Sequence, residues 1–96
     1  MKPCVYILAG CRNGTIYVGV TSELAQRISQ HKSGEADGFT KKYTVHNLVW
    51  YQYFETMSDA IAWEKKLKKW RREWKIKLIE EQNPYWNDLS AELTGE

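Results

Sequence analysis

Hydrophobic residues follow two different periods along the chain. Runs rich in β-branched and aromatic residues at 4–9, 15–20 and 48–55 are typical of β-strands. The pair Asn13-Gly14 lies between the first two runs, where an Asn-Gly pair favours a two-residue hairpin turn. The sequence therefore predicts an antiparallel hairpin in the first part of the chain and one further strand.

The predicted turn also fixes a register, because Arg12 would then pair with Thr15. In that register one face carries only apolar side chains: Val5, Ile7, Ala9, Val18 and Val20. Tyr6 and Tyr17 share the other face, with their Cα atoms about 13 Å apart. Gly19 lies on the same face and leaves room for another group to approach the backbone.

Three other segments have the spacing of helices. The first covers 22–34. The second begins at the capping box Thr56-x-x-Asp59 and runs to about Trp70, and the third covers 72–82 and stops before a proline. The element order is ββαβαα, which predicts a small α+β domain with a three-stranded antiparallel sheet flanked by helices.

Two charged residues fall on faces that should be buried. One face of the first helix carries four residues at helical spacing: Leu24, Arg27, Ile28 and His31. In the second helix Glu64 falls inside the apolar stripe. Because a buried charge is costly unless it is paired or used, Arg27 and Glu64 form either a buried ion pair or part of a functional site. Sheet packing is the simpler explanation for each tyrosine taken alone.

Length and composition restrict the class of protein. A chain of 96 residues forms one domain, which we place at 1–89, followed by an acidic C-terminal tail at 90–96. No apolar run approaches the ~20 residues of a membrane span, and no signal-peptide pattern is present. We expect a cytoplasmic protein without membrane contact, in which Cys4 and Cys11 are free thiols.

The net charge of +2 hides an asymmetry. Residues 1–79 hold all 14 Lys and Arg and seven of the 12 acidic residues, whereas 80–96 hold five acidic residues and no Lys or Arg. The segment 65–77 alone carries eight basic residues and one acidic residue. This pattern suggests a polyanionic partner such as nucleic acid, and a solvated helix face explains the charge run equally well.

Taken together, these residues resemble the GIY-YIG nuclease family. Val5-Tyr6-Ile7 and Tyr17-Val18-Gly19 stand where the family has its two name-giving triplets, followed by Leu24-x-x-Arg27-x-x-x-His31 and by Glu64 in a later helix. Four more stretches resemble small bacterial single-domain members: GFTKKY at 38–43, WEKKLKKW at 63–70, WKIKLIEEQ at 74–82 and NPYWNDL at 83–89. The resemblance covers about residues 3–89.

The resemblance implies the GIY-YIG endonuclease fold and metal-dependent hydrolysis of phosphodiester bonds in DNA, with low sequence specificity, in DNA repair or processing. The family's active-site positions fall on five residues: Tyr6, Tyr17, Arg27, His31 and Glu64. Asn83 is our candidate for an asparagine that the family often adds near the end of the domain, and capping of a helix end explains it as well. Glu64 is the expected ligand of one Mg²⁺ or Mn²⁺ ion.

Chemical roles follow for the other positions. Arg27 would neutralise charge that develops on the phosphoryl oxygens. Tyr6 would be the general base for the attacking water, and Tyr17 would orient the water or the phosphate. His31 would form a hydrogen bond with Tyr6 or take its proton. The ordinary pKa of a tyrosine is about 10, so the base role needs positive charge nearby.

DNA would be held through its phosphates by a set of basic residues: Arg12, Lys41, Lys42, Lys65, Lys68, Lys69 and Arg72. RNA remains an alternative substrate. Trp63 departs from the family, because the small members commonly have arginine just before the glutamate. A catalytically silent nucleic-acid-binding module is one competing interpretation. Another is a protein-interaction domain that uses four tryptophans as its surface: Trp63, Trp70, Trp74 and Trp86.

Overall fold

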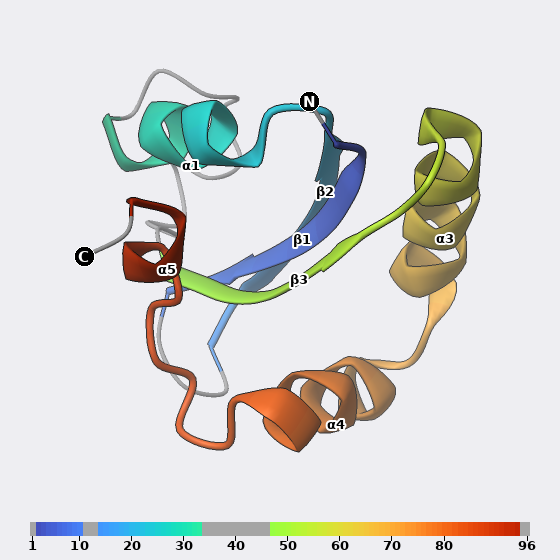
Figure 1. The fold of residues 1–96 in the computed structure, drawn as a ribbon. Coiled ribbons are helices and arrows are strands. Elements are labelled where there is room, and N and C mark those ends of the chain that lie inside the picture. Colours follow the sequence, from blue (N-terminus) through green and yellow to red (C-terminus); the bar gives the residue numbers. More distant parts are fainter. Residues whose placement is uncertain (1, 11–13, 34–46, 95–96) are drawn as a thin grey trace.

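A three-stranded antiparallel sheet forms the centre of the molecule (Figure 1). The computed structural model describes residues 2–10, 14–33 and 47–94. β1 (Cys4–Ala9) is the middle strand, and it pairs with β2 (Ile16–Thr21) on one side and β3 (Asn47–Tyr53) on the other. All six side chains of β1 are buried, as expected for a continuous apolar run covered on both faces.

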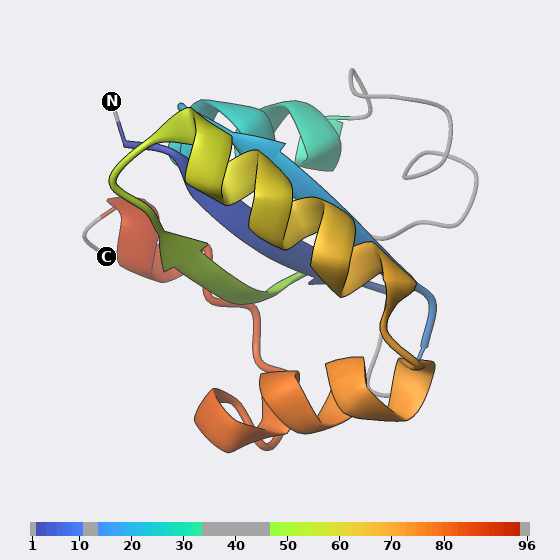
Figure 2. The same cartoon turned by 90° about the vertical axis from the view of Figure 1, so that its right-hand side faces the viewer.

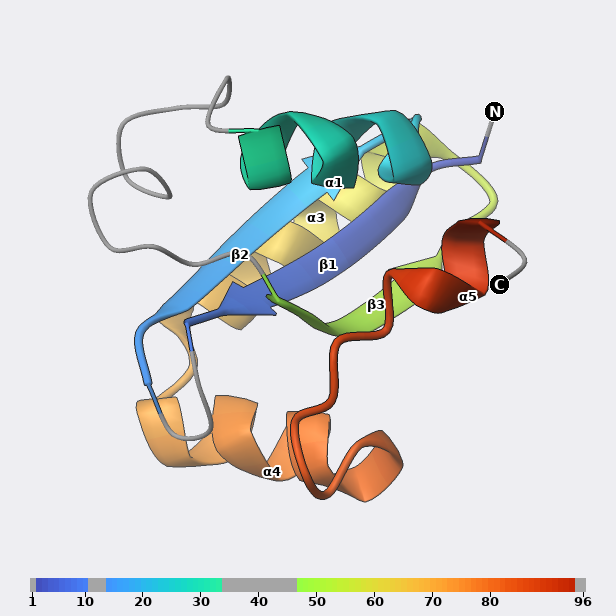
Figure 3. The same cartoon turned by 90° about the vertical axis from the view of Figure 1, so that its left-hand side faces the viewer.

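Helices cover both faces of this sheet. α1 (Leu24–Ser33) and the short α5 (Ala91–Thr94) lie on one face, as Figure 3 shows. α3 (Met57–Lys69) and α4 (Arg72–Gln82) lie on the other (Figure 2). The predicted α+β class and the order ββαβαα are confirmed, with α5 added after them.

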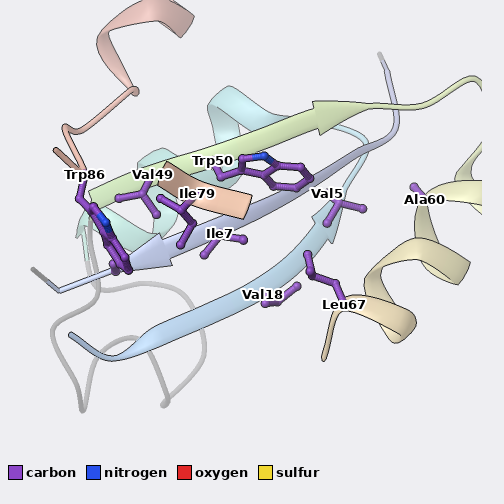
Figure 4. Close-up of a cluster of buried hydrophobic side chains, with 10 residues drawn as sticks. Val5, Ile7, Val18, Val49, Trp50, Ala60, Leu67, Ile79 and Trp86 are labelled. Carbon is purple, nitrogen blue, oxygen red and sulfur yellow. The ribbon is translucent and has the colours of Figure 1, made fainter. Parts of the chain in front are cut away.

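Alternation along β1 divides the interior into two apolar clusters. The larger cluster lies toward α3 and α4 and is formed by ten buried residues: Val5, Ile7, Ala9, Val18, Val49, Trp50, Ala60, Leu67, Ile79 and Trp86 (Figure 4). The smaller cluster lies toward α1 and contains Cys4, Tyr6, Leu8, Leu24, Ile28 and Leu48. The predicted assignment of Tyr6 and Tyr17 to the face opposite Val5 is therefore correct.

The predicted hairpin register is wrong by two residues. Val5 pairs with Val20 and Tyr6 pairs with Gly19, whereas the two-residue turn at Asn13-Gly14 would have placed Tyr6 opposite Thr21. A shift of two residues leaves every side chain on its face, so the apolar pattern did not distinguish the two registers. β1 ends at Ala9 and β2 begins at Ile16, so the connection between the two strands is longer than two residues.

Helix ends follow the local signals in the sequence. The Thr56 side chain accepts the Asp59 N–H at 3.1 Å and caps the start of α3. α4 covers 72–82 as predicted, and Asn83 caps its C-terminus with a hydrogen bond from its N–H to the Ile79 carbonyl at 2.8 Å.

The C-terminal segment is joined to the sheet by polar contacts. Asp88 accepts hydrogen bonds from the Leu48 N–H at 3.2 Å and the Ser90 N–H at 3.0 Å, and it forms an ion pair with Lys32 of α1 at 2.6 Å. The Tyr51 hydroxyl donates to Glu92 at 2.8 Å. The domain boundary at 89 stays a prediction. No helix in the described ranges is long and apolar enough to cross a membrane.

Candidate active site

Two tyrosines and one histidine form an aromatic cluster between the sheet and α1. The ring centroids of Tyr6 and Tyr17 lie 6.4 Å apart, and His31 lies 5.8 Å from Tyr6 and 5.5 Å from Tyr17. The corrected register explains this proximity, because Tyr17 is two residues from the residue opposite Tyr6. Such diagonal neighbours lie about 7–8 Å apart, rather than the 13 Å that the predicted register gave.

Gly19 makes room for the Tyr6 ring. A Cβ atom at position 19 would lie 2.5 Å from both Cζ and Oη of Tyr6, closer than non-bonded atoms can approach. The triplet Tyr17-Val18-Gly19 therefore requires glycine at its third position, since the Tyr6 ring lies over β2 at that point.

The Tyr6 hydroxyl forms a hydrogen bond with His31. Tyr6 Oη and His31 Nε2 are 3.1 Å apart, and the two residues are 1% and 0% exposed. The phenol donates to Nε2 in one histidine tautomer and accepts from it in the other. The hydrogen bond that the sequence suggested is present, and both of its residues are buried.

Arg27 lies one turn before His31 and is half-buried. Its Nη1 donates to Gln30 Oε1 at 3.3 Å. A hydrogen bond with Tyr6 is the main cause that raises the pKa of Arg27; partial burial opposes this, and the proximity of Tyr17 adds to it. Arg27 is thus held beside both phenols with its positive charge retained.

Glu64 is buried as the apolar stripe predicted, at 8% exposure, but its partner is not Arg27. Its Oε2 lies 2.5 Å from Nζ of Lys68, one turn further along α3. The hypothesis of a buried Arg27–Glu64 ion pair is wrong. α3 packs against β2 and β1, and α1 lies on the other face of the sheet.

The hydrogen-bond partners of Asn83 are backbone groups of β3 and of the segment after α4. Its Nδ2 donates to the Val49 carbonyl at 3.1 Å and to the Asn87 carbonyl at 2.8 Å, and its Oδ1 accepts the Asn87 N–H at 3.0 Å. Val49 is the extra residue where the pairing between β1 and β3 shifts register. Asn83 therefore satisfies backbone groups at this irregularity.

Four of the predicted phosphate-binding residues lie within the described ranges. Lys65 and Lys69 are exposed, Lys68 pairs with Glu64, and Arg72 donates to the Gly14 carbonyl at 2.5 Å. The other three lie outside the described residues: Arg12, Lys41 and Lys42. Lys75, which belongs to the basic segment 65–77, lies with these cations: burial chiefly lowers its pKa, and the charges of Arg72 and Lys68 lower it further.

A polar groove beside Arg27 was also missed. It has a volume of about 420 Å³ and is lined by Val20, Thr21, Ser22, Glu23, Gln26, Arg27 and Gln30. Gln30 three residues after Arg27 is the signal that could have revealed it, because residues at this spacing share a helix face. Across the described ranges, no three His, Cys, Asp or Glu side chains are grouped to hold a metal ion.

Comparison with known proteins is decisive for the family. Residues 2–77 match the GIY-YIG catalytic domain. This chain belongs to the GIY-YIG family. The family is one of nuclease-type domains, and the two triplets around Tyr6 and Tyr17 are its name-giving motif.

Relatives of similar size support this assignment. A UPF0213 protein of Staphylococcus saprophyticus is 34% identical over 80 residues, which cover 83% of this chain and 96% of the relative. A UPF0213 protein of Haloquadratum walsbyi is 35% identical over 77 residues, which cover 80% of this chain and 85% of the relative. These names state no activity.

A solved structure has the same fold. The solution NMR structure of a UPF0213 protein from Bacillus halodurans superimposes with a TM-score of 0.57 at 28% sequence identity. The match covers 95% of this chain and 96% of the other.

Proposed function

We propose that this protein is a metal-dependent endonuclease that hydrolyses phosphodiester bonds in DNA with low sequence specificity. The observation that carries the proposal is the convergence of Tyr6, Tyr17, Arg27 and His31 on one face of the sheet. Apolar packing alone does not require a guanidinium beside two phenols. Membership of a nuclease-type family supports the same conclusion.

Arg27 would bind the scissile phosphate. A guanidinium can donate to two phosphoryl oxygens at once, and it keeps its charge at every pH at which the protein is folded. The hydrogen bond with Gln30 limits the motion of this side chain, so charge stabilisation needs little rearrangement. Its half-buried position leaves it accessible to a phosphate from the adjoining polar groove.

Tyr6 and His31 would handle the proton of the attacking water. The positive charge of Arg27 favours negative charge on the Tyr6 oxygen, and neutral His31 can accept the phenol proton at Nε2. Tyr6 is 1% exposed, and the half-buried Tyr17 ring lies 6.4 Å from it, nearer to solvent. Tyr17 would therefore orient the water or the phosphate at the opening of the cluster.

Glu64 would hold the metal ion. Its largely buried carboxylate already lies against a cation, the ammonium of Lys68, so its oxygen donors and their surroundings fit a positive ion. One hard oxygen ligand suits Mg²⁺ or Mn²⁺, which takes its remaining ligands from water and substrate. When bound, the ion would polarise the phosphate and stabilise the leaving oxygen.

Exposed cations on α3 and at the start of α4 would hold the DNA backbone. Lys65 and Lys69 are exposed to solvent and can contact DNA phosphates. Contacts with phosphates carry no sequence information. We therefore expect weak sequence preference and a binding constant that falls steeply with salt. Faster cleavage of branched DNA than of plain duplex would support a role in DNA repair or processing.

Cleavage of supercoiled plasmid and of a branched oligonucleotide, with Mg²⁺, Mn²⁺ or EDTA, tests the proposal. Arg27→Ala and Glu64→Gln should both abolish metal-dependent cleavage while the proteins remain folded. Glu55→Gln, which removes an exposed carboxylate after β3, is the matched control and should cleave like the wild type. Salt-sensitive DNA binding with no cleavage under any of these conditions would favour the catalytically silent binding module instead.

A further inference from the structure

Three tryptophans form a continuous row where α3 meets α4. The ring centroids of Trp63 and Trp70 are 5.3 Å apart with an interplanar angle of 85°, and those of Trp70 and Trp74 are 6.0 Å apart at 83°. These edge-to-face contacts are favourable for aromatic rings. We call this row the tryptophan corner.

Burial decreases along the tryptophan corner. Trp63 and Trp70 are half-buried and pack against the larger apolar cluster, so a role in core packing explains both residues. Trp74 is 51% exposed and lies outside that cluster. Trp86, which the interaction-domain interpretation also placed on the surface, is 4% exposed and donates its indole N–H to Glu80 at 2.7 Å.

A groove opens beside the exposed end of the row. It has a volume of about 290 Å³ and is lined by Trp70, Trp74, Lys77, Leu78 and Glu81. Two indole rings and one leucine give the groove apolar walls, and a lysine lies at its margin. Glu81 balances the charge of Lys77 in this lining, so the groove itself matches a flat aromatic group, and a preference for negative charge depends on the cations around it.

Cations surround the aromatic surface. The Arg71 guanidinium lies 5.6 Å from the centroid of the Trp74 ring, and Lys66 Nζ lies 5.4 Å from that of Trp63. Arg71 is 74% exposed in its side chain, and its ion pair with Glu73 is long, at 3.6 Å. Exposed pairs of this kind contribute little, so Arg71 is available to an anionic ligand.

We propose that the tryptophan corner binds single-stranded nucleic acid, with an unpaired base stacked on the exposed Trp74 ring beside the groove. Arg71 and Lys77 contact the phosphates on either side of that base. Every base presents a π-face, so this binding is tolerant of sequence. The proposal rests on the proposed function only in taking nucleic acid as the ligand. It adds a preference for substrates with an unpaired segment over plain duplex.

Binding of three labelled probes without metal tests this proposal. The probes are a short oligothymidylate, an abasic oligonucleotide of the same length and a duplex of the same length. In EDTA, Trp74→Ala should weaken binding of oligothymidylate by about 5- to 160-fold, the range expected for loss of one stacked base. Binding of the abasic strand and the duplex should change by less than about twofold, because their phosphate contacts remain.

Two controls accompany the measurement. Tyr85→Ala removes another exposed aromatic side chain, 72% exposed in the loop after α4, and should leave all three affinities unchanged. Trp74→Leu keeps apolar cover over the helix and removes the aromatic face, so it replaces Trp74→Ala if that variant does not fold. Thermal unfolding of each variant reports the fold.

Three results would overturn the proposal. An unchanged affinity for oligothymidylate shows that no base stacks on Trp74. An equal loss for all three probes shows that Trp74 only supports the charged surface. A dimer in the wild type that Trp74→Ala dissociates, with unchanged oligonucleotide affinity, identifies a second copy of the chain as the occupant. Because no metal is present, the outcome is independent of cleavage and leaves the endonuclease proposal to its own test.

Discussion

Gly19 lies directly opposite Tyr6 in the β1–β2 ladder, and the Tyr6 ring occupies the space that a Cβ atom at position 19 would need. The strand pairing thus sets the position of the phenol oxygen relative to His31. Any side chain at position 19 must displace a ring that is 1% exposed and packed on all sides.

Gly19→Ala should therefore move the Tyr6 ring and break its hydrogen bond with His31. We expect a loss of about 1–3 kcal/mol in the free energy of unfolding, as for other overpacked sites, and at least about a tenfold fall in kcat. Chemical denaturation and plasmid cleavage measure the two effects. In a double-mutant cycle, Gly19→Ala should add little to the activity loss of Tyr6→Phe, since both act through one hydroxyl. Additive losses would contradict that explanation.

Tyr6→Phe should lower kcat by about 10²- to 10⁴-fold, the usual range for removal of a general base. It also removes the buried hydrogen bond between Tyr6 Oη and His31 Nε2, which costs about 0.5–1.5 kcal/mol of stability. Tyr17→Phe is the comparison, because Tyr17 is half-buried and its loss should affect KM as well as kcat. Cleavage by Tyr6→Phe at the wild-type rate would show that Tyr6 is not the base.

Lys68→Met should strengthen metal binding at Glu64, because it removes the ammonium that pairs with the same carboxylate oxygen. We expect a severalfold lower dissociation constant for Mn²⁺, measured by electron paramagnetic resonance, and a loss of about 1–3 kcal/mol in stability without metal, because the largely buried Glu64 carboxylate loses its cation. Glu64→Gln should show no comparable binding. A weaker Mn²⁺ affinity in Lys68→Met would mean that Lys68 supports the site rather than competing for it.

Asn83→Ala should unfold more easily by about 2–4 kcal/mol, since three hydrogen bonds to backbone groups are lost. Its specific activity per folded molecule should remain close to that of the wild type at a temperature well below its unfolding midpoint. An activity loss of more than about tenfold in the folded variant would restore Asn83 to the catalytic set.

The ion pair between Asp88 and Lys32 should make stability depend on pH in the acid range. Partial burial alone raises the pKa of Asp88, but hydrogen bonds from Lys32, Ser90 and the Leu48 backbone outweigh it and lower the pKa. A carboxyl with a lowered folded-state pKa stabilises the fold above its unfolded value of about 3.9, and this contribution is lost as the pH falls through the folded-state pKa.

Asp88→Asn should consequently be less stable than the wild type at neutral pH, and the difference should shrink below about pH 4. Urea unfolding across pH 2.5–7 measures it. Lys32→Met breaks the same pair from the other side and should show a similar, smaller dependence. A stability difference that stays constant down to the lowest pH would rule out this carboxylate as the titrating group.

Local signals predicted the elements well, and distant contacts were the part they missed. The limits of α4 agree with the prediction because Asn83-Pro84 marks a helix end in the sequence itself. The hairpin register failed because a period of two is unchanged by a shift of two residues. The partner of Glu64 and the contact between Asn83 and Val49 depend on how helices lie against the sheet, which no local pattern encodes.

The candidate site was predictable to a different extent. Motif spacing identified Tyr6, Tyr17, Arg27 and His31, and the structure brings these four together. Their close packing was not predictable, since it follows from the corrected register. Gln30 was missed because its spacing from Arg27 is informative only once Arg27 is treated as a site residue whose neighbours on the helix face should be examined.

The six residues of β1 contribute both to the apolar core and to the candidate active site. Along β1, Val5, Ile7 and Ala9 support the larger cluster, while the residues between them include Tyr6. No position in the strand faces solvent, so none can vary without a cost to folding or to chemistry. Inherited change in this protein should therefore accumulate on the exposed faces of α1 and α4, while the residues of β1 stay fixed.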